Sequence, residues 1–344
     1  MREDMAEEEP LEPGRRIIDP HLHFWKPYSG ASFFVPEAAA MIAASGHNVT
    51  HSVFVECHAM HRADGPEDMR VVGETEFVVG QAAMSASGNY GQARLGQCIV
   101  GTANLQLGER VAPVLEAHVS AGGGRFRGIR KATAWTARGM FGRPVDPAGA
   151  GLMARPAFAE GAGVLARMGL SLDVWCFHPQ LGELIALADA LPGLSIVLDH
   201  VGTPEDRSDE VRKGWATAIA ALAQRPNVTI KLGGLGMDHG NSIGDASRDA
   251  TSGELAGEWR SYFETCIAAF SPARAMFESN FPPDNASGSY GATWNAFKII
   301  AANYSEAEKD ALFSGIQRNL GLEISAVALS CRLHSRPSFR SGIA

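Results

Sequence analysis

The feature that most constrains the fold is a regular alternation of short β-branched segments with longer alanine-rich segments. The short segments have the nearly continuous apolar character of strands that are buried on both faces. We expect strands at 16–19, 52–56, 95–102, 128–131, 170–175, 194–198, 228–232 and 275–278. We expect helices at 36–45, 70–87, 110–121, 156–168, 181–191, 208–224, 254–270 and 293–302. Such a series of β–α units predicts an α/β fold with a closed parallel sheet, the (β/α)8 TIM barrel.

An open, doubly wound sheet is the alternative, but no G-x-G-x-x-G segment follows the first expected strand. The 344 residues are enough for one barrel of about 250 residues with extensions. We therefore expect a disordered acidic lead-in over residues 1–15, one barrel domain over 16–322 and a C-terminal tail over 323–344.

Charge and cysteine content restrict the class of protein. The formal net charge of −8 argues against a nucleic acid as partner, because a phosphate backbone calls for a basic surface. The five cysteines are scattered and form no C-x-x-C pair, which indicates free thiols in a reducing compartment. The N-terminus lacks the apolar segment of a signal peptide, and no stretch approaches the ~18 apolar residues of a membrane span. We expect a cytoplasmic protein that binds neither nucleic acid nor membrane; its oligomeric state stays open, a homo-oligomer included.

Polar and ionisable residues recur where the expected strands end. In a parallel barrel all strand carboxyl ends open on one mouth, so residues distant in sequence meet there. The residues at these positions are His21, His23, Glu56, His58, Arg130, Lys131, His178, Asp199, His200, Lys231, Asn280 and Asp284. We therefore expect the active site at this mouth.

His21 and His23 are separated by one residue at the end of the first expected strand. In an extended segment, residues i and i+2 point to the same face, so both imidazoles can face the barrel axis. This spacing suits joint coordination of a metal ion or joint contact with one substrate oxyanion. Trp25, Trp135 and Phe281 are candidates for a flat apolar wall against a ring substrate, with a place in the core as the alternative.

Four segments in this order resemble the amidohydrolase-related family of TIM-barrel hydrolases, which includes lactonases. The segments are I-I-D-P-H-L-H-F-W at 17–25, L-D-H-V-G-T-P at 198–204, K-L-G-G-L-G-M at 231–237 and F-E-S-N-F-P-P-D at 277–284. The resemblance extends from about residue 16 to about residue 320. It implies a hydrolase of small molecules with its active site at the barrel mouth.

The family pattern also implies particular site residues. His21, His23, His178 and His200 match its histidines after the first, fifth and sixth strands, whereas Asn280 stands where the family has an aspartate after the eighth. Asparagine has no charge and is a poor metal ligand. The resemblance therefore leaves two cases open. Either His21, His23 and His178 hold one divalent ion, for which Zn²⁺ is expected, or the protein works without metal.

The asparagine raises the question of which group activates water. Our hypothesis is that Asp284, four residues on, supplies the catalytic base while Asn280 positions the ligand; an ordinary turn residue is the alternative for Asp284. Glu56 and a metal-bound hydroxide are the other candidates. Without metal, Arg130 and Lys131 would help to polarise the carbonyl. The residues expected to contact substrate are Trp25, Glu56, His58, Arg130, Lys131 and Asn280.

Glu56 has a simpler interpretation as well. It can pair with a nearby cation such as Arg62 and brace the mouth without contacting substrate. For Arg130 the alternative is that its side chain faces the surrounding helices rather than the active site.

These features predict hydrolysis of a small cyclic ester (lactone) or a related acyl bond in a carboxylated molecule. Water attacks a carbonyl that is polarised by the cluster of His21, His23, His178 and His200. One alternative is metal-dependent decarboxylation within the same superfamily. The other is a degenerate barrel that only binds a ligand, for which the substitution at Asn280 is the best support.

Overall fold

Eight parallel strands, paired in the order of the sequence from β1 to β8, form the centre of the computed structural model. The structure describes residues 8–26, 31–137, 139, 147–237 and 249–315. The strands are β1 (Ile17–Leu22), β2 (Val49–Val55), β3 (Arg94–Gly101), β4 (Phe126–Ala132), β5 (Ser171–Trp175), β6 (Ile196–Leu198), β7 (Val228–Leu232) and β8 (Ala275–Phe277). The sheet closes where Leu22 bridges to Phe281, and the His23 N–H donates to the Phe281 carbonyl at 2.9 Å. The expected (β/α)8 barrel is confirmed.

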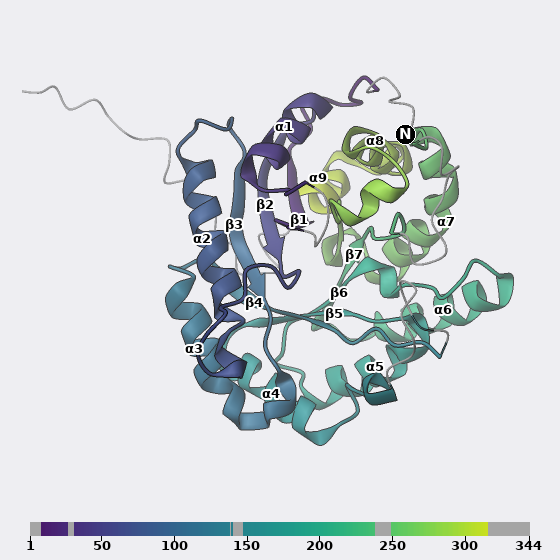
Figure 1. Cartoon of the computed structure of the whole chain (residues 1–344). Helices are drawn as coiled ribbons and strands as arrows, with labels where there is room; N and C mark the ends of the chain where they lie inside the picture. The colour runs from purple at the N-terminus through teal and green to yellow at the C-terminus, as the bar shows by residue number, and fades with distance from the viewer. Residues whose placement is uncertain (1–7, 27–30, 138, 140–146, 238–248, 316–344) are drawn as a thin grey trace, which may run out of the picture.

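Helices surround the strands on the outside (Figure 1). They are α1 (Val35–Ser45), α2 (Val72–Ala86), α3 (Ala112–Ala121), α4 (Pro156–Met168), α5 (Leu181–Ala190), α6 (Asp209–Leu222), α7 (Ser252–Phe270), α8 (Tyr290–Ala301) and α9 (Glu306–Ser314). All the expected helices are present, and α9 was not expected. Local signals explain the agreement at α4, which begins at Pro156 and ends before Gly169 in the left-handed conformation (φ 68°).

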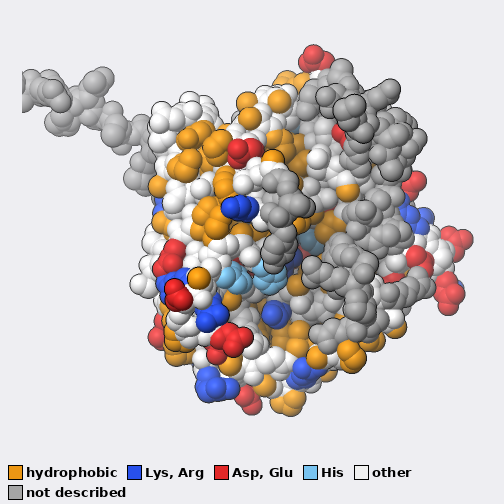
Figure 2. Space-filling model, in the orientation of Figure 1, with side chains coloured by type: hydrophobic (Ala, Val, Ile, Leu, Met, Phe, Trp, Pro, Cys, Tyr) orange, Lys and Arg blue, Asp and Glu red, His pale blue; other side chains and the backbone are white. Residues whose placement is uncertain are grey.

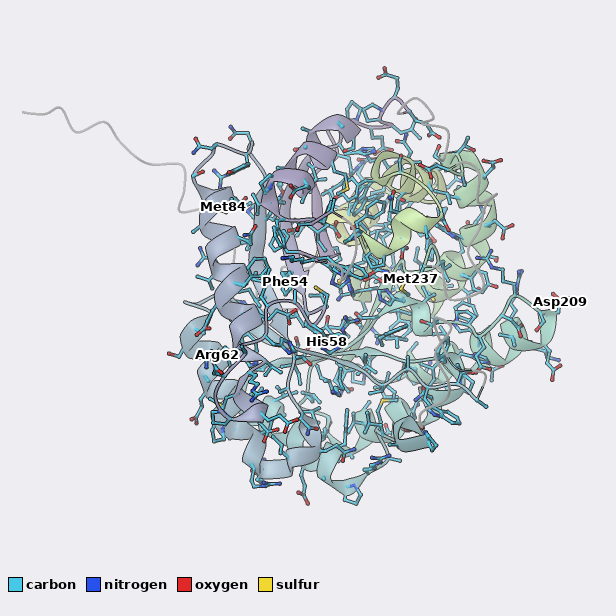
Figure 3. All side chains as sticks on the ribbon, in the orientation of Figure 1. Phe54, His58, Arg62, Met84, Asp209 and Met237 are labelled. Carbon is cyan, nitrogen blue, oxygen red and sulfur yellow. The ribbon has the colours of Figure 1, made fainter. Side chains whose placement is uncertain are left out.

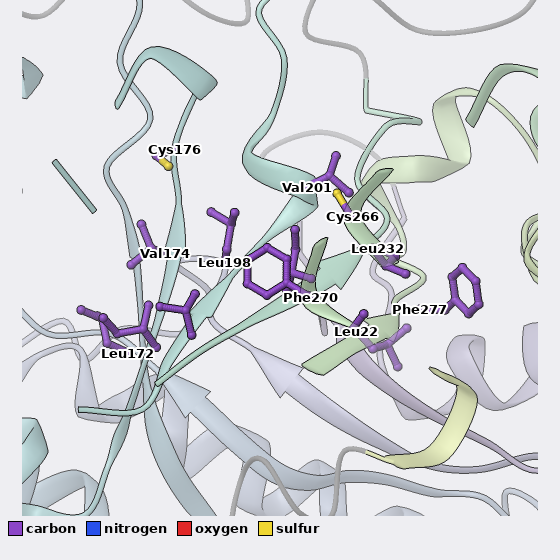
Figure 4. Close-up of a cluster of buried hydrophobic side chains, with 14 of the residues drawn as sticks. Leu22, Leu172, Val174, Cys176, Leu198, Val201, Leu232, Cys266, Phe270 and Phe277 are labelled. Atoms are coloured by element: carbon purple, nitrogen blue, oxygen red, sulfur yellow. The ribbon is translucent and has the colours of Figure 1, made fainter. Parts of the chain in front are cut away.

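The barrel has two apolar regions with different roles. Outside it, Leu198 and Leu232 pack with Cys266 and Phe270 of α7 in the large core (Figure 4). Inside the lumen, a small cluster consists of Ile18, Val53, Val55, Cys98, Val100, Val197 and Met276. Two positions after Val197 and Met276, directly beyond the ends of β6 and β8, the residues are Asp199 and Glu278. The inner cluster therefore forms an apolar floor beneath a charged layer.

Residues 8–15 differ from the expected disordered lead-in. Lys298 Nζ donates to the carbonyls of Leu11 (2.6 Å) and Glu12 (3.1 Å), and Arg15 pairs with Asp310 at 2.8 Å. These partners lie in α8 and α9, so the composition of the N-terminal segment alone could not indicate them. Residues 1–7 and the tail at 323–344 lie outside the described residues. Within the described part, no helix combines the length and the apolar character that a membrane span requires.

Candidate active site

A cavity of about 500 Å³ lies at the carboxyl ends of the strands. Figure 2 shows histidine side chains gathered near the centre of this face, and Figure 3 labels His58 and Met237, which line the cavity. Its lining residues are His23, Trp25, Cys57, His58, Arg130, Ala132, Trp175, His200, Met237, Asn280 and Pro283. The expected mouth therefore carries a pocket, and most of the residues expected to contact substrate line it.

Glu278, directly after β8, lies between two histidines. His200 donates from Nδ1 to Glu278 Oε1 at 2.7 Å and from its backbone N–H to the same oxygen at 3.1 Å. The other oxygen lies 2.7 Å from His21 Nδ1. Burial raises the pKa of Glu278, but the histidines His200 and His21 outweigh it and hold the pKa below its ordinary value. Glu278 is therefore a buried carboxylate that fixes both rings.

The protonation of the two rings differs. Burial lowers the pKa of His200, and the Glu278 carboxylate compensates only in part. Burial and the Lys231 ammonium lower the pKa of His21, but Glu278 and Asp199 outweigh them and raise it above the ordinary value. His200 is thus a neutral imidazole at neutral pH. Because its Nδ1 holds the hydrogen, Nε2 keeps a lone pair.

Lys231 of β7 supplies a fixed positive charge in the lumen. Its Nζ lies 2.7 Å from Asp173 Oδ2, 2.9 Å from Asp199 Oδ1 and 3.2 Å from His21 Nδ1, with the side chain fully buried. Burial lowers the pKa of Lys231, but Asp173 and Asp199 more than offset this and raise it. A buried ammonium is tolerated only with such partners. Lys231 and the two carboxylates of Asp173 and Asp199 therefore stabilise one another, and removal of any one would leave a buried charge unpaired.

His23 lines the cavity, and one of its ring nitrogens contacts Asn280, which follows β8. Its Nδ1 lies 2.8 Å from the Val55 carbonyl and its Nε2 3.2 Å from Asn280 Oδ1. Asn280 Nδ2 lies 2.6 Å from Asp284 Oδ1, and the Gly236 N–H donates to Asp284 Oδ2 at 3.2 Å. Asp284 is 2% exposed, and it is not among the described residues that line the cavity. Burial raises the pKa of Asp284 to about 8. This placement does not support the expected role of Asp284 as the base.

Glu56 pairs with Arg130 rather than with Arg62. The Arg130 guanidinium donates to Glu56 Oε1 and to the Glu56 carbonyl, each at 2.6 Å. Arg130 also lines the cavity. His58 also lines the cavity, with Nδ1 3.7 Å from Glu56 Oε2. Lys131 is not among the described lining residues, so its expected contact with substrate finds no support there.

His178 makes its hydrogen bonds with Glu205 and Thr203. It begins the short 3-10 turn η4 (His178–Gln180), and its Nδ1 accepts the Glu205 N–H at 3.3 Å. Its own N–H donates to the Thr203 carbonyl at 3.1 Å. Among the described residues, His178 does not line the cavity. The turn after β5 directs the backbone toward Thr203, which the sequence motif did not reveal.

Several residues that the sequence analysis did not name as site residues shape the site. Glu278 and Asp173 bear charge in the lumen, and Trp175 lines the cavity. A signal for Glu278 was available, because it lies two positions after Met276 on the inward face of β8 and within the F-E-S-N-F-P-P-D segment.

His21, Asp199 and His200 form the group that could hold a metal ion in the described part of the chain. One ligand atom from each lies within 4.8 Å of the others. Two imidazoles and a carboxylate are a donor set that zinc accepts. His21 Nε2 is buried and has no hydrogen-bond partner among the described residues, so the set fits a divalent ion. It shares only His21 with the expected set of His21, His23 and His178.

Comparisons with known proteins agree with this geometry. A model of the amidohydrolase family matches residues 18–315. An uncharacterized protein of Sinorhizobium fredii is 31% identical over 309 residues, which cover 86% of this chain and 95% of that protein.

Two solved structures are also similar. An amidohydrolase from Burkholderia multivorans with bound zinc is 25% identical with a TM-score of 0.67, and the match covers 89% of this chain and 99% of that one. A putative 2-pyrone-4,6-dicarboxylic acid hydrolase from Pseudomonas putida is 18% identical with a TM-score of 0.60, over 90% and 98% of the two chains. From the matched family and the barrel mouth together, we conclude that this chain belongs to the amidohydrolase family.

Proposed function

We propose that this protein hydrolyses a lactone of a small carboxylated molecule, with His200 as the general base. The observation that carries the proposal is the pairing of His200 with Glu278 at the cavity. A carboxylate on Nδ1 fixes the ring and leaves Nε2 as the proton acceptor, which is the arrangement of a general base with an orienting acid.

In this mechanism a water molecule attacks the lactone carbonyl. His200 Nε2 takes the proton of the attacking water, and the Glu278 carboxylate stabilises the imidazolium that forms. The Arg130 guanidinium, which lines the cavity, binds the carboxylate on the substrate ring and so orients the lactone carbonyl. His200 then returns the proton to the ring oxygen as the carbon–oxygen bond breaks, and the product is a hydroxy acid.

The walls of the cavity support the substrate class. Trp25, Trp175 and Met237 present apolar surface, and Arg130 is the buried cation among the lining residues. Flat apolar walls with few polar groups suit a small ring compound, and a guanidinium suits a carboxylate on that ring. A carboxylated lactone has both features.

A bound zinc ion would be held by His21, Asp199 and His200, where it would supply a Lewis acid that polarises the substrate carbonyl. Because His200 Nε2 has a single lone pair, His200 would act as the general base only in the protein without the ion. The apolar walls and Arg130 would bind the same substrate with or without the ion.

Turnover of a panel of carboxylated and uncarboxylated lactones, with and without a chelator, tests the proposal. We expect hydroxy-acid release that is faster for carboxylated rings. His200→Gln should lower kcat by about 10²–10⁴-fold, the usual contribution of a general base. His178→Gln is the matched control and should retain activity, because His178 does not line the cavity in the described chain. Release of CO2 from carboxylated rings instead would identify a decarboxylase, and binding without turnover would identify a ligand-binding barrel.

A further inference from the structure

Four consecutive residues shortly after β6 have a positive φ, and we call residues 200–203 the left-handed turn. The values are 55° at His200, 51° at Val201, 67° at Gly202 and 20° at Thr203. Positive φ is ordinary for glycine but uncommon for other residues, and a β-branched residue such as Val201 is an outlier there. Such a backbone is unfavourable by itself, so it persists only where contacts from the rest of the structure hold it.

The left-handed turn explains why two successive side chains reach the lumen. Val197 belongs to the inner cluster and Leu198 to the large outer core, as the alternation of a strand requires. A continued strand would place Asp199 inside and His200 outside. Instead both side chains contact the charged layer, since Asp199 Oδ1 and His200 Nδ1 each have a partner there at 2.9 Å and 2.7 Å. The positive φ at His200 breaks the alternation and brings its ring to the mouth.

Trp215 of α6 holds the turn from outside the barrel. Its side chain is 1% exposed, and the indole Nε1–H donates to the Val201 carbonyl at 2.7 Å. A buried indole N–H needs an acceptor and a buried carbonyl needs a donor, and this hydrogen bond satisfies both groups. Trp215 is not among the described residues that line the cavity. It therefore acts on the site through the backbone of the turn and not by contact with substrate.

Two further hydrogen bonds hold the turn at Thr203. The Trp175 indole Nε1–H donates to Thr203 Oγ1 at 3.0 Å, and the His178 backbone N–H donates to the Thr203 carbonyl at 3.1 Å. Trp175 ends β5 and His178 follows it three residues later. The left-handed turn is thus fixed between α6 on one side and the end of β5 on the other.

We propose that Trp215 and Trp175 are positioning residues that hold the left-handed turn and so place the His200 ring against Glu278. Without their hydrogen bonds, the backbone after Asp199 relaxes toward negative φ and the ring turns away from the carboxylate. Trp175 also lines the cavity, so Trp215 gives the sharper test. The consequence for catalysis rests on the proposed function, whereas the geometry of the turn does not depend on it.

Hydrogen exchange of the turn, followed by mass spectrometry on protein purified without added metal, tests the proposal without a substrate. The N–H groups of His200, Gly202 and Thr203 all donate hydrogen bonds in the structure, so their exchange reports the opening of the turn. Trp215→Phe keeps an aromatic ring and removes the indole N–H. We expect exchange in the turn to become faster by about tenfold or more in this variant.

Trp259→Phe is the matched control for Trp215→Phe. Trp259 is 2% exposed, and its Nε1 has no hydrogen-bond partner in the part of the chain that the structure describes. This variant loses the same indole atoms without losing a hydrogen bond to the turn, so exchange at 200–203 should stay close to that of the native chain. Equal exchange of the turn in the two variants would overturn the proposal.

Thr203 offers a second test, which also decides the matter if Trp215→Phe does not fold. Thr203→Val keeps the shape of the side chain and removes the oxygen that accepts from Trp175, whereas Thr203→Ser retains that oxygen. We expect faster exchange of the turn in Thr203→Val and nearly native exchange in Thr203→Ser. The same rate in both variants would show that the Trp175 hydrogen bond does not hold the turn.

Lactone kinetics measure the catalytic consequence. A displaced His200 ring should lower the kcat of Trp215→Phe by about 10- to 100-fold. The KM should stay within about threefold of the native value, because the residues that line the cavity are unchanged. A rise in KM with an unchanged kcat would contradict the positioning role. Absence of turnover in the native chain would refute the proposed function alone, because the exchange rates still decide whether Trp215 holds the turn.

Discussion

Glu278 Oε1 lies 2.7 Å from Nδ1 of His200, although 78 residues separate the two along the chain. The barrel brings them together because β6 and β8 both end at the same mouth. In the mechanism that we propose, this buried carboxylate fixes the His200 ring and stabilises its protonated form, as the orienting acid of a general base does.

Glu278→Gln tests that relationship. The amide keeps the shape of the side chain but cannot stabilise an imidazolium as a carboxylate does, so kcat should fall by about 10²–10⁴-fold with a smaller change in KM. Steady-state kinetics on the preferred lactone measure this. Glu76→Gln, at an exposed pair with Arg62, is the matched control, and full activity in Glu278→Gln would remove the pair from the mechanism.

The pH dependence follows from the lowered pKa of His200. Only the neutral ring accepts a proton, so activity is present above this pKa and is lost as the pH falls through it. We expect kcat/KM to decline at a pH below 6.5, the ordinary histidine value. A pH–rate profile measures the midpoint, and a midpoint above 6.5 would contradict the assignment of the base.

Gly234 is expected to tolerate no side chain. Its φ is +71°, and an added Cβ would lie 2.3 Å from Cγ of His200. Gly234→Ala should displace the His200 ring, and a misplacement of this kind can cost about 10²-fold in rate. Gly193→Ala is the control, because a Cβ added at Gly193 would meet no atom within 4 Å. Equal kcat/KM for the two variants would show that the ring position is not critical.

Glu74 of α2 supports the loop after β2. It is 1% exposed, and its Oε1 accepts the N–H groups of Cys57 (3.0 Å) and Ala59 (2.8 Å). Glu74→Ala leaves these two N–H groups without their acceptor, at about 1–3 kcal/mol each, so the free energy of unfolding should fall by about 2–6 kcal/mol. Glu74→Gln retains an acceptor oxygen and should lose less. Urea denaturation compares the two, and an equal loss would show that these hydrogen bonds are not the cause.

Asp284 also predicts a pH dependence of stability. Its pKa is raised from 3.8 to about 8, so this group stabilises the fold fully below pH 3.8, and its contribution is lost progressively up to about pH 8. The total loss is on the order of 5 kcal/mol. Asp284→Asn has no titrating group at this position and does not undergo this loss. The melting temperature of the variant minus that of the native chain should therefore increase as the pH is raised from 5 to 8. A constant difference across that range would show an ordinary pKa for Asp284.

Much of the fold could be predicted from the sequence because its signals are local. The alternation of apolar strands with helices depends on periodicity within short windows, and caps such as Pro156 and Gly169 act within one turn. The same reasoning placed His21, His23 and His200 at strand ends. Parallel strands then bring such ends to one mouth, which made the general position of the site predictable.

The sequence by itself thus determined the barrel, the mouth and the family. Only the tertiary structure decided which side chains meet there. The His178 ring accepts the Glu205 N–H, Asp284 is enclosed against Asn280 and Gly236, and Glu278 lies between His21 and His200. The physical reason is that burial and hydrogen bonding depend on neighbours from other strands, and these set both the direction and the charge of a side chain whatever its position in the motif.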